Sequence, residues 1–172
     1  MYRVSGDSFF QVNRFLVDAM VDTAIEDAKG ESALDLYAGV GLFSLPLARR
    51  FHKVTAVESG TGAVRDLGFN AERAGLEIDA QQSRVDQYLS KLKVAPDLVL
   101  ADPPRAGLGK DAVRYLGRLQ APRITLAACD PATLARDLAG LLGAGYRLAR
   151  ITLIDLFPQT FHIETVAQLE RA

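Results

Sequence analysis

The sequence predicts an α/β fold: a mostly parallel, twisted sheet with helices on both faces and a C-terminal antiparallel hairpin. Three observations support this prediction. From Ser32 onward, short runs rich in Val, Leu and Ile alternate with segments of helical period, which is typical of repeated βαβ units. A glycine loop follows the first run, at residues 35–41. The last two strand-like runs have only a short connection between them, which predicts the hairpin.

The elements follow one another in a regular order along the chain. Apolar residues recur at helical period in residues 13–28, which predicts an amphipathic N-terminal helix packed on the core. We then predict strands that are each followed by a helix; the strands are residues 33–37, 53–57, 79–82, 98–101 and 123–128, and the helices are residues 42–50, 62–74, 85–92, 110–119 and 131–142. Residues 146–156 and 162–169 form the hairpin. We expect a single domain over residues 1–172, with the sheet in residues 32–172.

Composition excludes several classes of protein. With 172 residues, 49% of them hydrophobic, the chain can bury one core. A formal net charge of −1 gives no basic excess for gripping phosphates, so any affinity for nucleic acid must be local. No apolar run reaches the roughly 18 residues that span a bilayer, and the N-terminus is unlike a signal peptide, so we expect a cytoplasmic protein. The single cysteine and two histidines predict no disulfide and no metal site.

The glycine loop predicts a cofactor site. Gly39 and Gly41 let the backbone approach a ligand closely at a helix N-terminus, and Glu58 ends the next strand, where an acid accepts hydrogen bonds from ribose hydroxyls. These features fit NAD or S-adenosylmethionine. Ser44 stands where dinucleotide loops usually have a third glycine. A carboxylate at Asp35 would repel a pyrophosphate but suits a cofactor with an amine and a sulfonium, which favours S-adenosylmethionine. A packing turn without a ligand is the alternative.

A second motif follows the fourth predicted strand, at the carboxyl edge of the sheet where ligands bind in such folds. Pro103 and Pro104 fix the backbone there, which would hold Asp102 rigidly beside the cofactor. Arg105 is suited to contact a phosphate or a carboxylate. A structural turn would explain the two prolines equally well, but it would require neither Asp102 nor Arg105.

Two reactive side chains occupy the ends of later strands. Cys129 ends the fifth strand, and we predict Asp130 and Pro131 as the N-cap and first residue of the following helix. The helix dipole would lower the pKa of the thiol and favour the thiolate, although the Asp130 carboxylate opposes this; a buried core cysteine fits equally well. Glu164 starts the last strand with its sequence neighbours pointing to the opposite face, so it can face a pocket. A solvated glutamate on an edge strand is the alternative.

Residues 8–13, ahead of the first helix, combine aromatic rings with amide side chains. Phe9 and Phe10 could stack on a base, and Gln11 could form hydrogen bonds with it. A hydrophobic staple with capping of the helix by Asn13 explains the same residues without a ligand.

In their order along the chain, these motifs resemble the RNA (uracil-5-)-methyltransferase family, which makes 5-methyluridine in tRNA and ribosomal RNA. The matching blocks cover nearly the whole chain and are SFFQVN, DLYAGVGLFSLPLA, AVES, ADPPRAGL, ACDPATLARDL and FPQTFHIETV. The resemblance implies the Rossmann-like fold of class I methyltransferases, S-adenosylmethionine as cofactor, and a flipped or single-stranded uridine of tRNA or rRNA as substrate. We expect a catalytic domain alone, without the RNA-binding β-barrel called TRAM, and a monomer.

The resemblance also implies roles for individual residues. It makes Cys129 the nucleophile and Glu164 the general base. It places further side chains around the methyl donor and the target uracil: Gln11, Tyr37, Glu58, Asp86 and Asp102. Around the cysteine the family usually has tyrosine, serine and asparagine, where this chain has Leu126, Ala128 and Asp130.

Two other functions remain compatible with the sequence. The first is a methyltransferase that acts on an exocyclic amine or a protein side chain and uses Asp102, Pro103 and Pro104 as its acceptor motif. That chemistry needs no cysteine, so Cys129→Ala would leave it intact. The second is a non-catalytic RNA-binding protein that retains the fold, and it would fail to bind S-adenosylmethionine.

Overall fold

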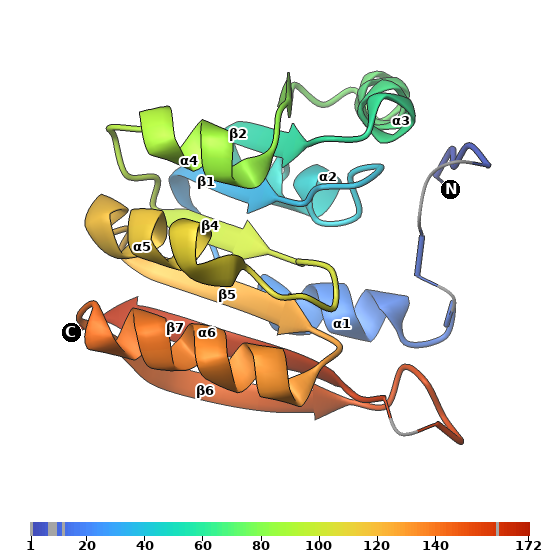
Figure 1. Cartoon of the computed structure of the whole chain (residues 1–172). Helices are drawn as coiled ribbons and strands as arrows, with labels where there is room; N and C mark the ends of the chain where they lie inside the picture. The colour runs from blue at the N-terminus through green and yellow to red at the C-terminus, as the bar shows by residue number, and fades with distance from the viewer. Residues whose placement is uncertain (1, 7–9, 12, 161) are drawn as a thin grey trace.

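The computed structural model describes residues 2–6, 10–11, 13–160 and 162–172. Its centre is a seven-stranded sheet in the order β3-β2-β1-β4-β5-β7-β6 (Figure 1). The strands are β1 (Gly30–Leu36), β2 (Phe51–Glu58), β3 (Asp79–Gln82), β4 (Leu98–Ala101), β5 (Arg123–Ala128), β6 (Tyr146–Ile154) and β7 (Glu164–Arg171). The first five pair in parallel, and β7 pairs antiparallel with both β5 and β6. The predicted fold class and its C-terminal hairpin are confirmed.

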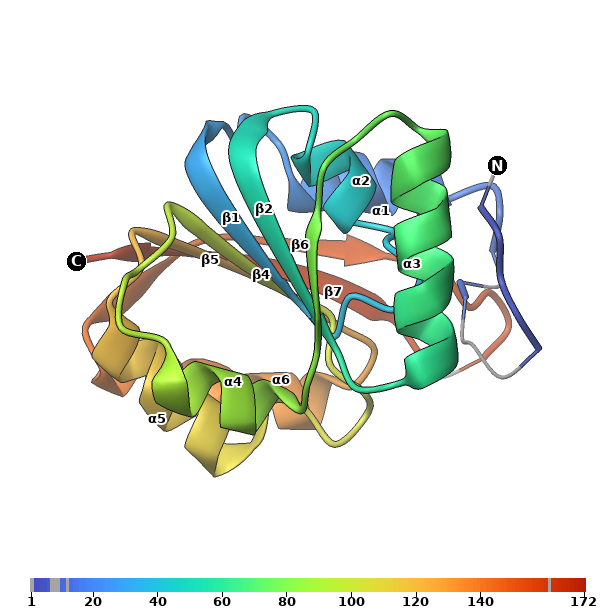
Figure 2. The ribbon, with the colours of Figure 1, turned by 90° about the horizontal axis from the view of Figure 1, so that it is seen from above.

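Helices cover both faces of the sheet (Figure 2). One face carries α4 (Val85–Lys91), α5 (Gly109–Leu119) and α6 (Pro131–Gly143), and the other carries α1 (Val17–Ala24), α2 (Ser44–Leu47) and α3 (Thr61–Arg73). Each face buries its own cluster of apolar side chains, because the parallel strands are apolar on both sides. Within the described part of the chain, no helix is long and apolar enough to cross a membrane.

Two helices are shorter than predicted. The first is regular only over Val17–Ala24, not residues 13–28, because the Asn13 side chain accepts a hydrogen bond from the Phe15 amide and donates one to the Leu156 carbonyl. Asp27 then adopts a left-handed conformation (φ 52°), which ends the helical path. The helix after the glycine loop covers only Ser44–Leu47, not residues 42–50.

The position of β7 corrects one sequence expectation. Glu164 was compatible with a solvated place on an edge strand, but the edge of the sheet is β6, and β7 lies between β5 and β6. Both sides of β7 are therefore hydrogen-bonded to neighbouring strands. Glu164 is only 1% exposed as a result.

Candidate active site

Most of the side chains that the sequence predicts to be functional lie around one cavity at the carboxyl ends of the parallel strands, where such folds bind ligands. The cavity has a volume of about 760 Å³. The predicted residues that line it are Phe10, Gln11, Tyr37, Gly39, Glu58, Asp102, Arg105, Cys129 and Glu164. Ser8, Phe9 and Val12 of the predicted base-stacking segment lie outside the described residues.

The glycine loop approaches the cavity in a conformation that favours glycine. Gly39 and Gly41 have φ values of 53° and 96°, and a Cβ at Gly41 would meet the Leu45 side chain at 2.6 Å. Tyr37, the residue after β1, also has a positive φ of 62°, an uncommon conformation for a bulky residue. Such backbone strain is typical of binding sites, where the surrounding structure holds it in place.

Glu58 ties the glycine loop to the loop after β2. One carboxylate oxygen accepts a hydrogen bond from the Gly39 amide at 3.0 Å, and the other accepts one from the Gly60 amide at 2.7 Å. The side chain is half-buried and lines the cavity. Glu58 therefore holds together two backbone segments of the cavity wall, and its side chain also borders the cavity.

Asp35 does not line the cavity, in contrast to the predicted contact with a cofactor amine. It is fully buried beneath the glycine loop, where the Ser44 hydroxyl donates a hydrogen bond to it at 2.5 Å. Its second oxygen has no partner among the described residues, and burial raises its pKa to about 7. The structure thus gives Asp35 a supporting place under the loop. Gly41, also predicted as a contact, shapes the loop without lining the cavity.

Asp86 lies at a neighbouring cavity of about 370 Å³, separate from the one that contains Cys129. Its two oxygens accept hydrogen bonds from the Arg84 guanidinium, each at 3.1 Å. The two cavities share Tyr37 and Glu58 in their walls, so Asp86 faces a side extension of the main site.

The pairing of β5 with β7 brings Cys129 to Glu164. In this antiparallel pair Ala128 lies opposite Thr165. The next positions outward are Cys129 and Glu164, which therefore lie beside each other at the strand ends. The predicted cap of the following helix is confirmed, with Pro131 in its first turn and the Asp130 carboxylate accepting a hydrogen bond from the Thr133 amide at 2.8 Å.

The pKa of the Cys129 thiol is raised, whereas the helix dipole by itself would lower it. Burial and the neighbouring Glu164 carboxyl raise the pKa of Cys129, and the Arg105 guanidinium opposes them only in part. The Asp130 carboxylate caps the helix end that was expected to stabilise a thiolate. A thiolate at this site therefore depends on Arg105, which also lies 3.1 Å from the Nε2 atom of His162.

Two carboxyl groups in the cavity have pKa values close to neutrality. Burial, and secondarily the charge of Asp102, raises the pKa of Glu164 to about 8. Burial raises the pKa of Asp102 to about 7, while a hydrogen bond from Gln11 acts against the rise. One oxygen of Glu164 is buried without a partner among the described residues. A buried carboxyl with a pKa near the working pH is suited to proton transfer.

Contacts that no sequence pattern indicated hold the Asp102 loop. Asp137, a buried residue of α6, accepts a hydrogen bond from the Leu108 amide at 2.7 Å, and Arg136 donates one to the Ala106 carbonyl at 2.8 Å. A Cβ at Gly107 (φ 77°) would meet the Asp137 carboxylate at 2.4 Å, so the two segments require glycine there. Because α6 begins two residues after Cys129, these contacts fix the Asp102 loop relative to the thiol.

Sequence reasoning also missed two aromatic walls of the cavity, Phe43 and Phe157. Phe157 belongs to the connection between β6 and β7, which was predicted as a short turn and as part of a family block, without a role for the ring. Its ring packs edge-on against His162, with the centroids 6.1 Å apart. An aromatic residue in a short connection directly before the Glu164 strand was the signal that could have identified it.

We expect the protein to become less stable between about pH 5 and pH 8. Asp35, Asp102 and Glu164 keep their protons to about pH 7–8 when folded, whereas their ordinary values of 3.8 and 4.5 make the unfolded chain release them earlier. The folded state therefore binds more protons in this window, and stability falls as pH rises. The shift at Asp35 alone corresponds to about 4 kcal/mol. Urea unfolding at several pH values measures the slope; Asp35→Asn should flatten it, and a stability that is constant or rises would contradict the prediction.

Comparison with known proteins gives consistent results over the whole chain. The family model described as tRNA (Uracil-5-)-methyltransferase matches residues 1–82 and 81–172. An uncharacterized RNA methyltransferase of Streptomyces coelicolor is 42% identical over 99% of this chain, and 39% of its own length is covered. The 23S rRNA (uracil(1939)-C(5))-methyltransferase of Shewanella frigidimarina is 39% identical over 95% of this chain, with 37% of its own length covered.

A solved structure agrees with these matches. The tRNA (uracil-54, C5)-methyltransferase of Pyrococcus abyssi, in complex with S-adenosyl-L-homocysteine, superposes with a TM-score of 0.87 and 34% identity. The match covers 98% of this chain and 41% of that one. This chain thus spans about two fifths of the length of the relatives it matches.

Proposed function

The chain belongs to the tRNA (uracil-5-)-methyltransferase family, and from that premise we propose that it transfers a methyl group from S-adenosylmethionine to C5 of a uridine in tRNA or rRNA. The observation that supports this most directly is that Cys129, directly after β5, and Glu164, at the start of the neighbouring β7, both line the cavity that the glycine loop borders. A nucleophile and a buried carboxyl in one cavity fit a reaction that needs both a covalent adduct and a proton acceptor.

The residues around the glycine loop fit S-adenosylmethionine, which supplies an electrophilic methyl group when bound. The backbone at Gly39 faces open space, because a Cβ there would meet no atom within 4 Å. In our proposal Glu58 accepts hydrogen bonds from the ribose hydroxyls, Tyr37 lines the same wall, and Asp86 binds the part of the methyl donor that extends into the neighbouring cavity.

Cys129 and Glu164 would perform the chemistry on the uracil ring. Uracil C5 is a poor nucleophile, so we propose that the Cys129 thiolate first adds to C6, which forms a C6–S bond and makes C5 enolate-like. C5 then attacks the methyl group, and S-adenosylhomocysteine leaves. Glu164 removes the C5 proton, the C6–S bond breaks, and the thiolate departs as the C5–C6 double bond re-forms. Arg105 stabilises the thiolate, and Asp102 and Gln11 orient the uracil edge.

The target base must leave its stack before the thiol can reach C6, at a cost of a few kcal/mol. In our proposal the aromatic rings of Phe10 and Phe157 in the cavity wall offset part of this cost by packing against the base. Of the relatives described above, one is named for tRNA and one for 23S rRNA, so both RNA classes are candidate substrates.

We expect the purified chain, given labelled S-adenosylmethionine and total RNA that lacks 5-methyluridine, to form labelled 5-methyluridine. Mass spectrometry of the digested nucleosides measures the product. Label on an exocyclic amine would favour the alternative N-methyltransferase and would contradict the proposal. Absence of S-adenosylmethionine binding in calorimetry would favour the non-catalytic alternative.

A further inference from the structure

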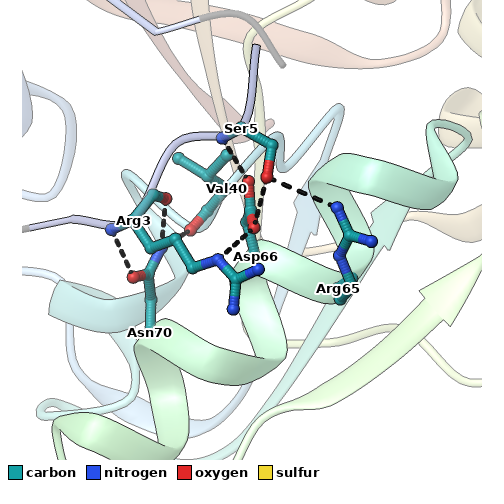
Figure 3. Close-up of polar contacts among 6 residues, drawn as sticks. All are labelled: Arg3, Ser5, Val40, Arg65, Asp66 and Asn70. Atoms are coloured by element: carbon teal, nitrogen blue, oxygen red, sulfur yellow. Dashed lines mark hydrogen bonds and ion pairs between the residues drawn. The ribbon is translucent and has the colours of Figure 1, made fainter. Parts of the chain in front are cut away.

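The N-terminal segment, residues 2–6, lies against α3 through two buried polar side chains of that helix (Figure 3). Asp66 is 0% exposed and accepts hydrogen bonds from the amide and hydroxyl of Ser5, at 2.6 and 3.0 Å. Arg3 completes the arrangement with its Nε atom 3.0 Å from the same carboxylate. A buried carboxylate is costly unless it is paired and hydrogen-bonded, and here the N-terminal segment provides the partners.

Asn70, one helical turn further along α3, connects this segment to the glycine loop. Its amide oxygen accepts a hydrogen bond from the Arg3 backbone amide at 2.7 Å. Its amide nitrogen donates to the Arg3 carbonyl and to the Val40 carbonyl, each at 3.0 Å. One side chain that is 3% exposed therefore joins the N-terminal segment to the loop that borders the methyl-donor site.

The N-terminal segment in turn contacts the acceptor wall of the cavity. The Tyr2 hydroxyl donates a hydrogen bond to the Leu42 carbonyl at 3.3 Å, and the Tyr2 ring lies 5.4 Å from the Phe10 ring between centroids. Phe10 and Gln11 line the cavity that contains Cys129. If the N-terminal segment moved away from α3, the Tyr2 ring that packs near Phe10 would move away from the glycine loop with it.

We propose that Asp66 and Asn70 are positioning residues that set the acceptor wall, Phe10 and Gln11, in register with the methyl-donor loop. This inference rests on the proposed function of the cavity. The two residues differ in a way that can be measured. Among the described residues, the hydrogen bonds and the ion pair of the Asp66 side chain all come from the N-terminal segment, whereas Asn70 also donates a hydrogen bond to the glycine loop at Val40.

The test compares Asp66→Asn with Asn70→Asp, for RNA and for S-adenosylmethionine separately. Asp66→Asn removes the ion pair with Arg3, and we expect KM for a stem-loop RNA to rise about tenfold while the Kd for S-adenosylmethionine stays within about twofold. Asn70→Asp replaces both amide hydrogens with a repelling oxygen, and we expect both constants to rise, by about tenfold each. Glu72→Gln, an exposed substitution on the same helix, is the matched control and should change neither.

A third variant guards against unfolding. Ser5→Ala removes one hydroxyl from the N-terminal segment but keeps the Arg3 ion pair and the Ser5 amide on Asp66. We expect an increase of about threefold in the RNA KM, with a melting temperature closer to the wild type than that of Asp66→Asn. If all three variants lose activity only in proportion to folded protein, with KM and Kd unchanged, the residues are merely structural and the inference is wrong. If the wild type binds S-adenosylmethionine but makes no 5-methyluridine, the proposed function is wrong. The inference is then tested by the Kd for S-adenosylmethionine alone, and an unchanged Kd in Asn70→Asp would overturn it.

Discussion

Cys129→Ala is expected to lower the rate of 5-methyluridine formation at least about 10⁴-fold, because without the thiolate the reaction must rely on the weak nucleophilicity of uracil C5 itself. RNA that contains 5-fluorouridine measures the role of the cysteine directly. Fluorine cannot leave C5 as a proton does, so the wild-type protein should remain joined to this RNA and migrate as a complex in a denaturing gel. The alanine variant should give no such complex.

Binding of the methyl donor separates this loss from misfolding. Cys129 is half-buried and follows β5, which lies two strands from the β1 strand that leads into the glycine loop, so Cys129→Ala should leave the Kd for S-adenosylmethionine unchanged. An equal amount of trapped complex in the variant, or unchanged formation of 5-methyluridine, would remove the cysteine from the mechanism. Unchanged methyl transfer by the variant, with the label on an exocyclic amine, would instead support the N-methyltransferase alternative.

Glu164→Gln is expected to separate the two halves of the reaction. The variant keeps the size of the side chain but cannot accept the C5 proton, so turnover should fall about 10³-fold while the thiol still adds to C6. With ordinary RNA, we expect a methylated covalent complex to accumulate, which denaturing gels and mass spectrometry detect. Turnover at the wild-type rate would exclude Glu164 as the base.

The pH profile gives an independent measurement of the same role. A general base acts in its deprotonated form, and the pKa of Glu164 is raised to about 8 by burial and by the Asp102 charge. The rate of product release from the methylated adduct of the wild type should therefore rise with pH and level off above about pH 8. Because the thiol has a raised pKa too, adduct formation in Glu164→Gln should still increase with pH, whereas release of product should stay slow at every pH.

Local sequence patterns predicted the parallel part of the sheet closely. The strands at residues 79–82, 98–101 and 123–128 have the predicted bounds. The last two are buried parallel strands, which form short apolar runs between turn residues. The first helix was predicted too long, because Asn13 uses its side chain to bind the Leu156 carbonyl far along the chain. That contact depends on tertiary structure, and no local pattern records it.

The residues of the candidate site could be predicted from the sequence, but their burial, their pKa shifts and their contacts could not. Cys129 and Glu164 were identified before the strand order was known, yet the pKa of the thiol is raised, not lowered. The rise depends on burial and on the Glu164 carboxyl, which is 35 positions away in sequence. Asp35 was expected in the cavity because it flanks the glycine loop, and it points instead to Ser44 below it. Asp66 and Asn70 carried no sequence signal, because their partners are mainly backbone atoms of distant segments.

The reversed direction of β7 decides which end of that strand can take part in chemistry. Tyr37, Glu58, Asp102 and Cys129 reach the cavity from the carboxyl ends of the parallel strands, whereas Glu164 is the first residue of its own strand. Eight residues of extended chain span about 26 Å, so a parallel strand in the same slot would deliver its first residue to the opposite rim of the sheet. The direction of this one strand therefore decides whether Glu164 lies in the cavity, where it can accept a proton, or at the opposite rim of the sheet.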